Sequence, residues 1–181
     1  MFERVKSVQK MFLRPNLGNS MKRMYALALL FITFTTAYWL QPALAGNLPV
    51  VHDFTVEAKE SSQKKAPILV LFMSSTCHYC KTVLRDFLLP MQSNPEYTNK
   101  VILRQIEISS KDKLIDFNGE ITSQREFSSR HKVWAVPTVI LFDSKGRVLT
   151  SIVGLLTVDY YLSYLDNAIN ESQEKIKTTA N

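Results

Sequence analysis

The sequence predicts an α/β protein in which a central mixed sheet carries helices on both faces. Two short, continuous apolar runs, 68–73 and 138–142, are typical of strands that are buried on both sides of a sheet. Apolar residues recur at helical spacing over 77–89 and 157–169. Helices therefore alternate with buried strands, as in a layered α/β fold.

The first half of the domain predicts a helix, a strand, a helix and a strand. Residues 53–65 are polar with spaced apolar side chains, which indicates a short amphipathic helix. After the first apolar run, a turn of Ser and Thr precedes the helix over 77–89, which we expect Pro90 to end. Residues 101–108 alternate well enough to form the second strand.

The next part of the chain predicts a loop or hairpin and a short helix. Residues 112–120 predict a loop or short hairpin with Asn118-Gly119 at its tip. Ser123 with Glu126 predicts a capping box that opens a short helix.

The last part of the domain predicts a hairpin and a helix. The strand 138–142 turns at 143–146 and returns over 147–153 as an antiparallel strand. The helix that Thr157 opens is followed by a polar tail, 171–181, which we expect to fray.

Residues 1–45 have the layout of an export signal. Lys22 and Arg23 precede an almost uncharged apolar stretch from Met24 to Trp39, and Ala43-Leu44-Ala45 forms a small-x-small cleavage site. This arrangement predicts a secretory signal peptide.

Two points about this segment stay open. We predict cleavage after Ala45, with an uncleaved membrane anchor over 24–44 as the alternative. Translation begins either at Met1 or at Met21, since the second start suffices for a signal peptide. The domain over 46–170 is then expected in the periplasm or an equivalent oxidising space.

Without that segment the chain is nearly neutral. The first 45 residues hold six Lys and Arg and one acid, which leaves 16 basic and 15 acidic residues. The basic residues are interleaved with acids, whereas a nucleic-acid binder needs them gathered on one face. We therefore expect no nucleic-acid partner.

The two cysteines of the chain, Cys77 and Cys80, fall at the start of the helix that follows the first buried strand. A thiol attacks only as thiolate, and the unpaired N–H groups at a helix N-terminus lower the pKa of a thiol placed there. Cys80 lies one turn deeper, within reach of a mixed disulfide at Cys77. The spacing predicts Cys77 as the attacking thiol and Cys80 as the resolving thiol. Between them, cationic His78 would stabilise the thiolate further, and Tyr79 is grouped with it as a tuning residue.

The same spacing has other uses. Either His78 or His131 could complete a zinc site, but the sequence has no second close pair of strong ligands, so we predict no metal. Covalent haem attachment needs histidine directly after the second cysteine, and Lys81 stands there. We predict no bound cofactor.

These features resemble the thioredoxin family over nearly all of residues 50–170. The resemblance lies in the apolar strand 68–73, in Cys77-His78-Tyr79-Cys80-Lys81 at a helix start, and in Val136-Pro137-Thr138 before the closing hairpin and helix. It implies a thioredoxin fold with an insertion between the helix that bears the cysteines and the strand that follows the proline.

The resemblance also implies how a substrate binds. It places a cis peptide bond before Pro137, which packs beside the cysteines, and it lets Val136 offer its backbone to an extended substrate segment. Trp134 either lines the contact surface or packs in the core.

The chain departs from thioredoxins proper at several positions. Thr76, His78-Tyr79 and Leu71 stand where thioredoxins have Trp, Gly-Pro and a buried Asp. The missing carboxylate removes the family's usual proton acceptor for the resolving cysteine, and Glu107 is a weak candidate to replace it. The insertion over 109–123 resembles exported thioredoxin-like proteins linked to sulfur-compound oxidation or cytochrome maturation.

We therefore expect a thiol-disulfide oxidoreductase that acts on protein or small thiol substrates and exchanges electrons with a redox partner at the membrane. A reductase is slightly favoured over an oxidase or isomerase. The alternative from another class is a non-catalytic module of the same fold that binds a peptide or a metal. A monomer is the default for such a domain.

Overall fold

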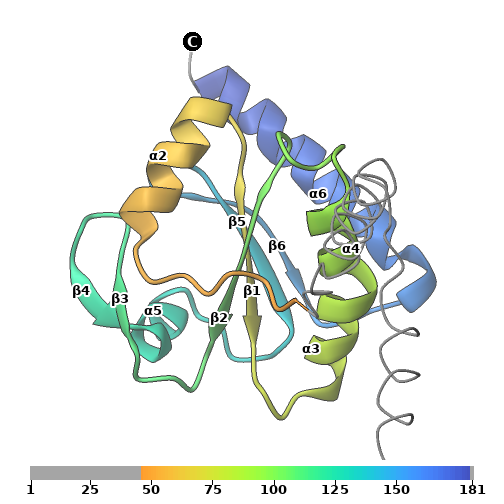
Figure 1. Ribbon diagram of the computed structural model, residues 1–181, viewed down its shortest axis with the longest axis horizontal. Helices are drawn as coiled ribbons and strands as arrows, with labels where there is room; N and C mark the ends of the chain where they lie inside the picture. The colour runs from red at the N-terminus through yellow and green to blue at the C-terminus, as the bar shows by residue number, and fades with distance from the viewer. Residues whose placement is uncertain (1–45, 180–181) are drawn as a thin grey trace, which may run out of the picture. The chain divides into compact units, whose positions relative to one another are not determined.

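The computed structural model describes residues 46–179. Its centre is a four-stranded mixed sheet in the order β2-β1-β5-β6 (Figure 1). β2 runs parallel to β1, whereas β5 is antiparallel to both of its neighbours. The strands are β1 (Ile68–Met73), β2 (Ile102–Glu107), β5 (Thr138–Phe142) and β6 (Val148–Val153). The predicted mixed sheet is confirmed.

The predicted signal peptide (1–45), the alternative anchor (24–44) and the choice between Met1 and Met21 lie outside the described residues. Among the helices that the structure describes, none combines the length and the apolar character needed to cross a bilayer. The described residues are those that follow the predicted cleavage site.

Helices cover both faces of the sheet, as predicted. Figure 1 shows α3, α4 and α6 on one face and α2 and α5 on the other. The helical elements are α2 (Phe54–Lys64), α3 (His78–Val83), the π turn η1 (Leu84–Leu88), α4 (Leu89–Ser93), α5 (Gln124–Arg130) and α6 (Val158–Thr179). Each face of the sheet therefore has its own apolar core.

Residues of β1 alternate between these two cores. Leu69 and Leu71 pack on the face covered by η1 and α6. Val70 and Phe72 pack on the other face, with Phe127 of α5. Because both sets are buried, the strand reads in the sequence as an uninterrupted apolar run.

The helix that follows the cysteines does not end at Pro90, and that prediction is wrong. Helical backbone continues to Ser93. In the π turn before the proline, the Leu89 N–H donates to the Leu84 carbonyl five residues earlier. This wider turn resets the hydrogen-bond register, so that Pro90 falls in the first turn of α4, where a residue without an N–H is tolerated.

The insertion forms a separate antiparallel hairpin of β3 (Lys113–Ile115) and β4 (Ile121–Ser123). The predicted tip at Asn118-Gly119 is confirmed. Gly119 has a φ of +81°, a conformation that favours glycine, and the Asp116 carboxylate accepts a hydrogen bond from the Asn118 N–H at 2.9 Å.

The predicted start of α5 is confirmed, whereas the predicted end of α6 is wrong. The capping box of Ser123 and Glu126 is confirmed at the start of α5. The frayed polar tail is wrong, because α6 continues to Thr179. Its last turns are held to the sheet by Lys175, whose Nζ donates to the Leu149 carbonyl at 2.6 Å.

Tyr161 joins α6 to the helix that bears the cysteines. Its fully buried ring lies 5.0 Å from that of Phe87 in η1. Among the described residues its hydroxyl has no hydrogen-bond partner. Burial of the phenol raises the pKa of Tyr161 from 10.0 to about 12.

We expect the stability of the protein to fall at alkaline pH in a way that depends on Tyr161. Between pH 10 and about 12 the unfolded phenol has lost its proton while the folded one keeps it, so stability is complete below pH 10 and decreases above it. Tyr161→Phe should remove about 2 kcal/mol of this decrease. At neutral pH it should leave stability unchanged or higher, since the lost hydroxyl was unpaired.

Urea unfolding at neutral pH and at several alkaline pH values measures this effect, with Tyr160→Phe as the matched control on the exposed side of α6. Tyr97, whose pKa is also raised to about 12 by its hydrogen bond to Asp166, accounts for part of the decrease that remains. If Tyr161→Phe lost stability with pH as steeply as the wild type, the burial argument would be wrong.

Candidate redox site

Four chain segments meet at one end of the strands of the central sheet. β1 and β2 are parallel, so Met73 and Glu107, their last residues, lie side by side. β5 runs the other way, so its first residue, Thr138, pairs with Phe72. Val153, at the end of β6, also pairs with Thr138. The segments after β1, after β2, before β5 and after β6 therefore meet at this end of the strands (Figure 1).

A tight turn carries the chain from β1 to Cys77. The Cys77 N–H donates to the Ser74 carbonyl at 3.0 Å. Cys77 is the N-cap of α3, and its Sγ accepts a hydrogen bond from the Cys80 N–H at 3.1 Å. The sulfur therefore lies against an amide of the first helical turn that has no carbonyl partner within the helix, where a thiolate would be stabilised.

The two sulfurs differ in access. Cys77 and Cys80 form a disulfide. Cys80 is fully buried, whereas Cys77 is partly exposed. Leu71, at the position of the family's buried aspartate, is a fully buried member of the apolar core.

The loop before β5 lies beside the disulfide. The Val136–Pro137 peptide bond is cis, which confirms what the resemblance implied. The Val136 carbonyl oxygen lies 3.8 Å from Cys77 Sγ. On the other side, the Gly154 N–H donates to the Pro137 carbonyl at 2.7 Å. Of the three predicted substrate-binding residues, the structure thus brings Val136 next to Cys77, with Pro137 following it in the same loop.

Large apolar side chains on these segments face solvent. Trp134 is 79% exposed, so the alternative that it packs in the core is wrong. Tyr79 is 62% exposed. Sequence reasoning missed Leu156, which is 74% exposed and follows β6. The hairpin register was the signal for it, because it places the end of β6 beside Pro137.

Residues 54–169 match the family described as thioredoxin-like domains. The chain belongs to this family. The match covers more than half of the sequence and includes the Cys77–Cys80 disulfide at the start of α3. This thioredoxin-like protein is therefore a thiol-disulfide oxidoreductase. A comparison with curated proteins finds no match.

Solved structures with a similar fold include a DsbH oxidoreductase, at 18% identity and a TM-score of 0.49, over 72% of this chain and 90% of that one. A thioredoxin-fold protein from Helicobacter pylori has 18% identity and a TM-score of 0.45, over 65% and 86%. The reduced Schistosoma mansoni thioredoxin pre-protein has 16% identity and a TM-score of 0.44, over 70% and 98%. The family assignment rests on the sequence match.

His131 and His78, the two possible zinc ligands offered by the sequence, lie in different surroundings. His131 packs between Phe127 and Phe142, at centroid distances of 4.4 and 4.9 Å, and its burial lowers its pKa. His78 is exposed beside Tyr79. Within residues 46–179, no three His, Cys, Asp or Glu side chains lie close enough together to hold a metal ion.

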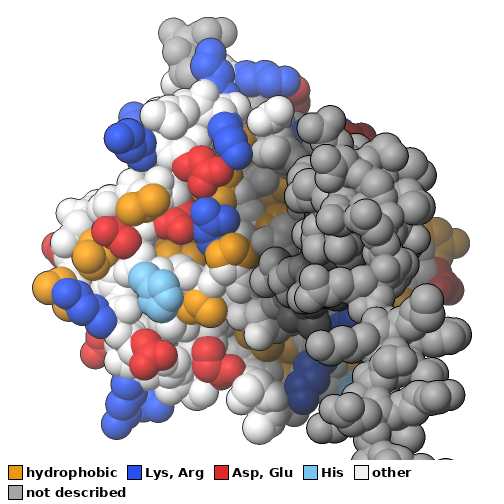
Figure 2. Space-filling model, in the orientation of Figure 1, with side chains coloured by type: hydrophobic (Ala, Val, Ile, Leu, Met, Phe, Trp, Pro, Cys, Tyr) orange, Lys and Arg blue, Asp and Glu red, His pale blue; other side chains and the backbone are white. Residues whose placement is uncertain are grey.

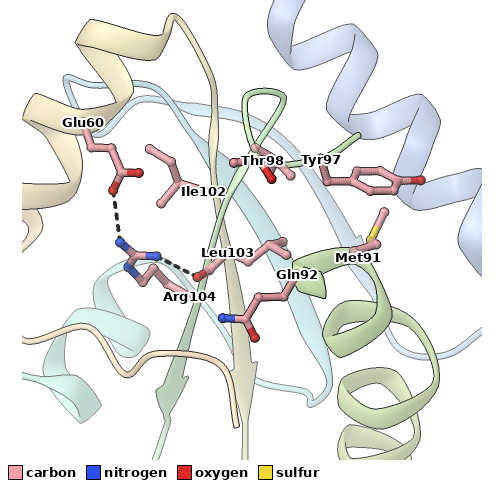
Figure 3. Close-up of a pocket in the computed structure, with 9 residues that line it drawn as sticks. Glu60, Met91, Gln92, Tyr97, Thr98, Ile102, Leu103 and Arg104 are labelled. Atoms are coloured by element: carbon pink, nitrogen blue, oxygen red, sulfur yellow. Dashed lines mark hydrogen bonds and ion pairs between the residues drawn. The ribbon is translucent and has the colours of Figure 1, made fainter. Parts of the chain in front are cut away.

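A small hollow beside β2 is a poor substrate site. Its volume is about 140 Å³. Figure 3 shows that its charged groups are already engaged, because Arg104 contacts both the Glu60 carboxylate and the Leu103 carbonyl. The residues that line it are Glu60, Met91, Gln92, Tyr97, Thr98, Val101, Ile102, Leu103 and Arg104, which include neither cysteine.

The charged surface is mixed. On the face in Figure 2, acidic and basic side chains are interspersed across the described part of the molecule. Such a face lacks the single-sign stripe that tracks a nucleic-acid backbone.

We expect Trp134→Ala to separate binding of a protein substrate from folding. An exposed side chain contributes little to stability, so the free energy of unfolding should change by less than about 0.5 kcal/mol. Reduction of a protein disulfide should slow about three- to tenfold, while exchange with a small soluble disulfide stays the same. Val148→Ala, also exposed but at the far end of β6, is the control. Equal slowing with both substrates would contradict a contact role for Trp134.

Proposed function

We propose that this protein exchanges disulfides in the periplasm, with Cys77 as the attacking thiol and Cys80 as the resolving thiol. The observation that carries the proposal is the asymmetry of the two sulfurs. Cys77 is partly exposed and its Sγ accepts a hydrogen bond from the Cys80 amide, while Cys80 is fully buried. A substrate can therefore reach the first sulfur and not the second.

The reaction in the reducing direction has two steps. The Cys77 thiolate attacks one sulfur of a substrate disulfide, the substrate S–S bond breaks, and the released substrate thiolate takes up a proton. Cys80 then loses its proton and attacks the Cys77 sulfur, which forms the Cys77–Cys80 disulfide and releases the second substrate thiolate. Two electrons pass to the substrate. A redox partner at the membrane restores the dithiol.

Val136 and Pro137 are proposed to hold the substrate. The Val136 backbone lies against Cys77 Sγ, so a substrate segment that pairs with it as an added strand presents its own sulfur to Cys77. The exposed rings of Trp134 and Tyr79 and the side chain of Leu156 offer apolar contact to such a segment. This supports a protein substrate, with small disulfides as simpler ones.

The direction is proposed to be reduction. The hairpin inserted between β2 and α5 supports it, since it resembles exported proteins linked to sulfur-compound oxidation or cytochrome maturation. The signal-like segment over residues 1–45 supports export. His78 works against this direction, because a cation beside the Cys77 thiolate favours an oxidant.

The reduction potential of the Cys77–Cys80 pair decides the direction. In graded thiol-disulfide buffers we expect a reduction potential of about −270 mV, the value typical of thioredoxin. A value close to about −120 mV would instead identify a strong oxidant of the same fold.

Replacement of Cys80 by alanine tests the proposal itself. The variant cannot resolve a mixed disulfide, so we expect Cys80→Ala to accumulate substrates bound covalently through Cys77. These adducts should be released by dithiothreitol, and Cys77→Ala, the control, should accumulate none. If Cys80→Ala trapped nothing, a non-catalytic peptide-binding or metal-binding module would be the better description.

A further inference from the structure

Glu107 lies where the sheet meets the turn Ser74–Cys77, which leads to the attacking cysteine and is called the redox turn. It is the last residue of β2 and pairs with Met73, the last residue of β1. Just beyond it the Ile108 N–H donates to the Met73 carbonyl at 3.0 Å. The side chain of Glu107 therefore starts level with the point where the chain leaves β1 towards Cys77.

The Glu107 carboxylate holds the chain on both sides of this junction. Its Oε2 accepts a hydrogen bond from the Ser75 N–H at 2.6 Å. Its Oε1 accepts one from the Ser109 hydroxyl at 2.8 Å. A hydrogen bond to an ionised acceptor is about twice as strong as a neutral one. One side chain thus joins the turn before Cys77 to the first residues of the insertion.

Ser75 lies inside the turn that delivers Cys77 to the helix start. That turn is closed by the bond from the Cys77 N–H to the Ser74 carbonyl. The Ser75 N–H points out of the turn, to Glu107. The carboxylate therefore fixes the orientation of the turn relative to the sheet, and with it the position of Cys77 at the N-terminus of α3.

Hydrogen bonds from α5 also fix the backbone of Glu107 and the insertion that follows it. The Glu107 N–H donates to Oε1 of Gln124 at 2.9 Å, and Gln124 is only 2% exposed. Arg125 donates from its guanidinium to the Ser109 carbonyl at 2.8 Å. The segment added between β2 and α5 is thus connected to the redox turn through Glu107.

We infer that Glu107 is a positioning residue for the redox pair, which holds the Ser74–Cys77 turn so that Cys77 Sγ meets the amide of Cys80. This inference rests on the proposed exchange of disulfides at Cys77. This role differs from that of a proton acceptor for Cys80, because the carboxylate acts through its hydrogen bonds to Ser75 and Ser109 and takes no proton from the reacting sulfur.

The position and the charge of Glu107 have opposite effects on the Cys77 thiol. A negative charge near the turn disfavours the thiolate, so loss of the charge alone would lower the pKa of the thiol. Loss of the hydrogen bond between Glu107 and the Ser75 N–H moves Cys77 away from the helix amides and raises the pKa of its thiol. The sign of the change therefore separates the two roles.

The test is the pH dependence of the rate at which the reduced protein reacts with a small aromatic disulfide. We expect Glu107→Ala to shift the midpoint of the profile upward and to slow the reaction at neutral pH about tenfold. Glu107→Gln keeps an oxygen that can accept the Ser75 N–H but loses the charge, so its midpoint should lie at or slightly below that of the wild type and its reaction should not slow. Glu120→Ala, which removes an acid of the insertion hairpin that does not touch the turn, is the matched control.

A second variant checks that Glu107 acts through Ser75. Ser75→Pro removes the N–H that the carboxylate holds, at the second position of a four-residue turn, where proline is well tolerated. It should slow the reaction as Glu107→Ala does, and the two changes together should be no worse than either one. Additive effects, a downward shift in Glu107→Ala, or equal effects of Ala and Gln would overturn the inference.

The wild type in the same assay separates this inference from the proposed function. A wild type that exchanges and variants that match it in rate and midpoint would overturn the positioning role alone. A wild type that exchanges no disulfide would overturn both.

Discussion

The pairing of β1 with β5 is the constraint on which the rest of the site depends. The backbone hydrogen bonds of this antiparallel pair place Phe72 opposite Thr138. The chain leaves β1 and enters β5 at the same end of the strands, so Cys77 lies next to Val136 although they are 59 positions apart in the sequence. This register brings the helix amides and the cis-proline loop together, and the pairing of β5 with β6 adds the loop after β6.

Sequence reasoning found the features that depend on local chemistry. The strands β1 and β5 were recognisable because both of their faces are buried, which leaves only apolar residues in the run. The capping box of Ser123 and Glu126 and the glycine at the hairpin tip are set by neighbouring residues. The cysteine pair at a helix start falls in the same group, since the strand, turn and helix are contiguous in the chain.

What the sequence did not show depends on contacts between distant segments. The sequence predicts that Pro90 ends a helix, and this prediction is wrong because a π turn leaves no signal in the composition. The exposure of Trp134 follows from the shape of the loop before the cis peptide bond. The bond of Glu107 to the Ser75 N–H joins residues 32 positions apart and requires the parallel register of β1 and β2. Such contacts are properties of the packed sheet.

The length of α6 has a consequence for aggregation. β6 lies at an edge of the sheet, and an open edge is a template on which another chain can add a strand. Near its start the ladder is interrupted, because Leu149 lies between the paired residues Val148 and Thr150. The Lys175 side chain, from the last turns of α6, donates a hydrogen bond to the Leu149 carbonyl. A charged group and a bulge thus disfavour sheet growth between copies at β6, the edge strand opposite β2.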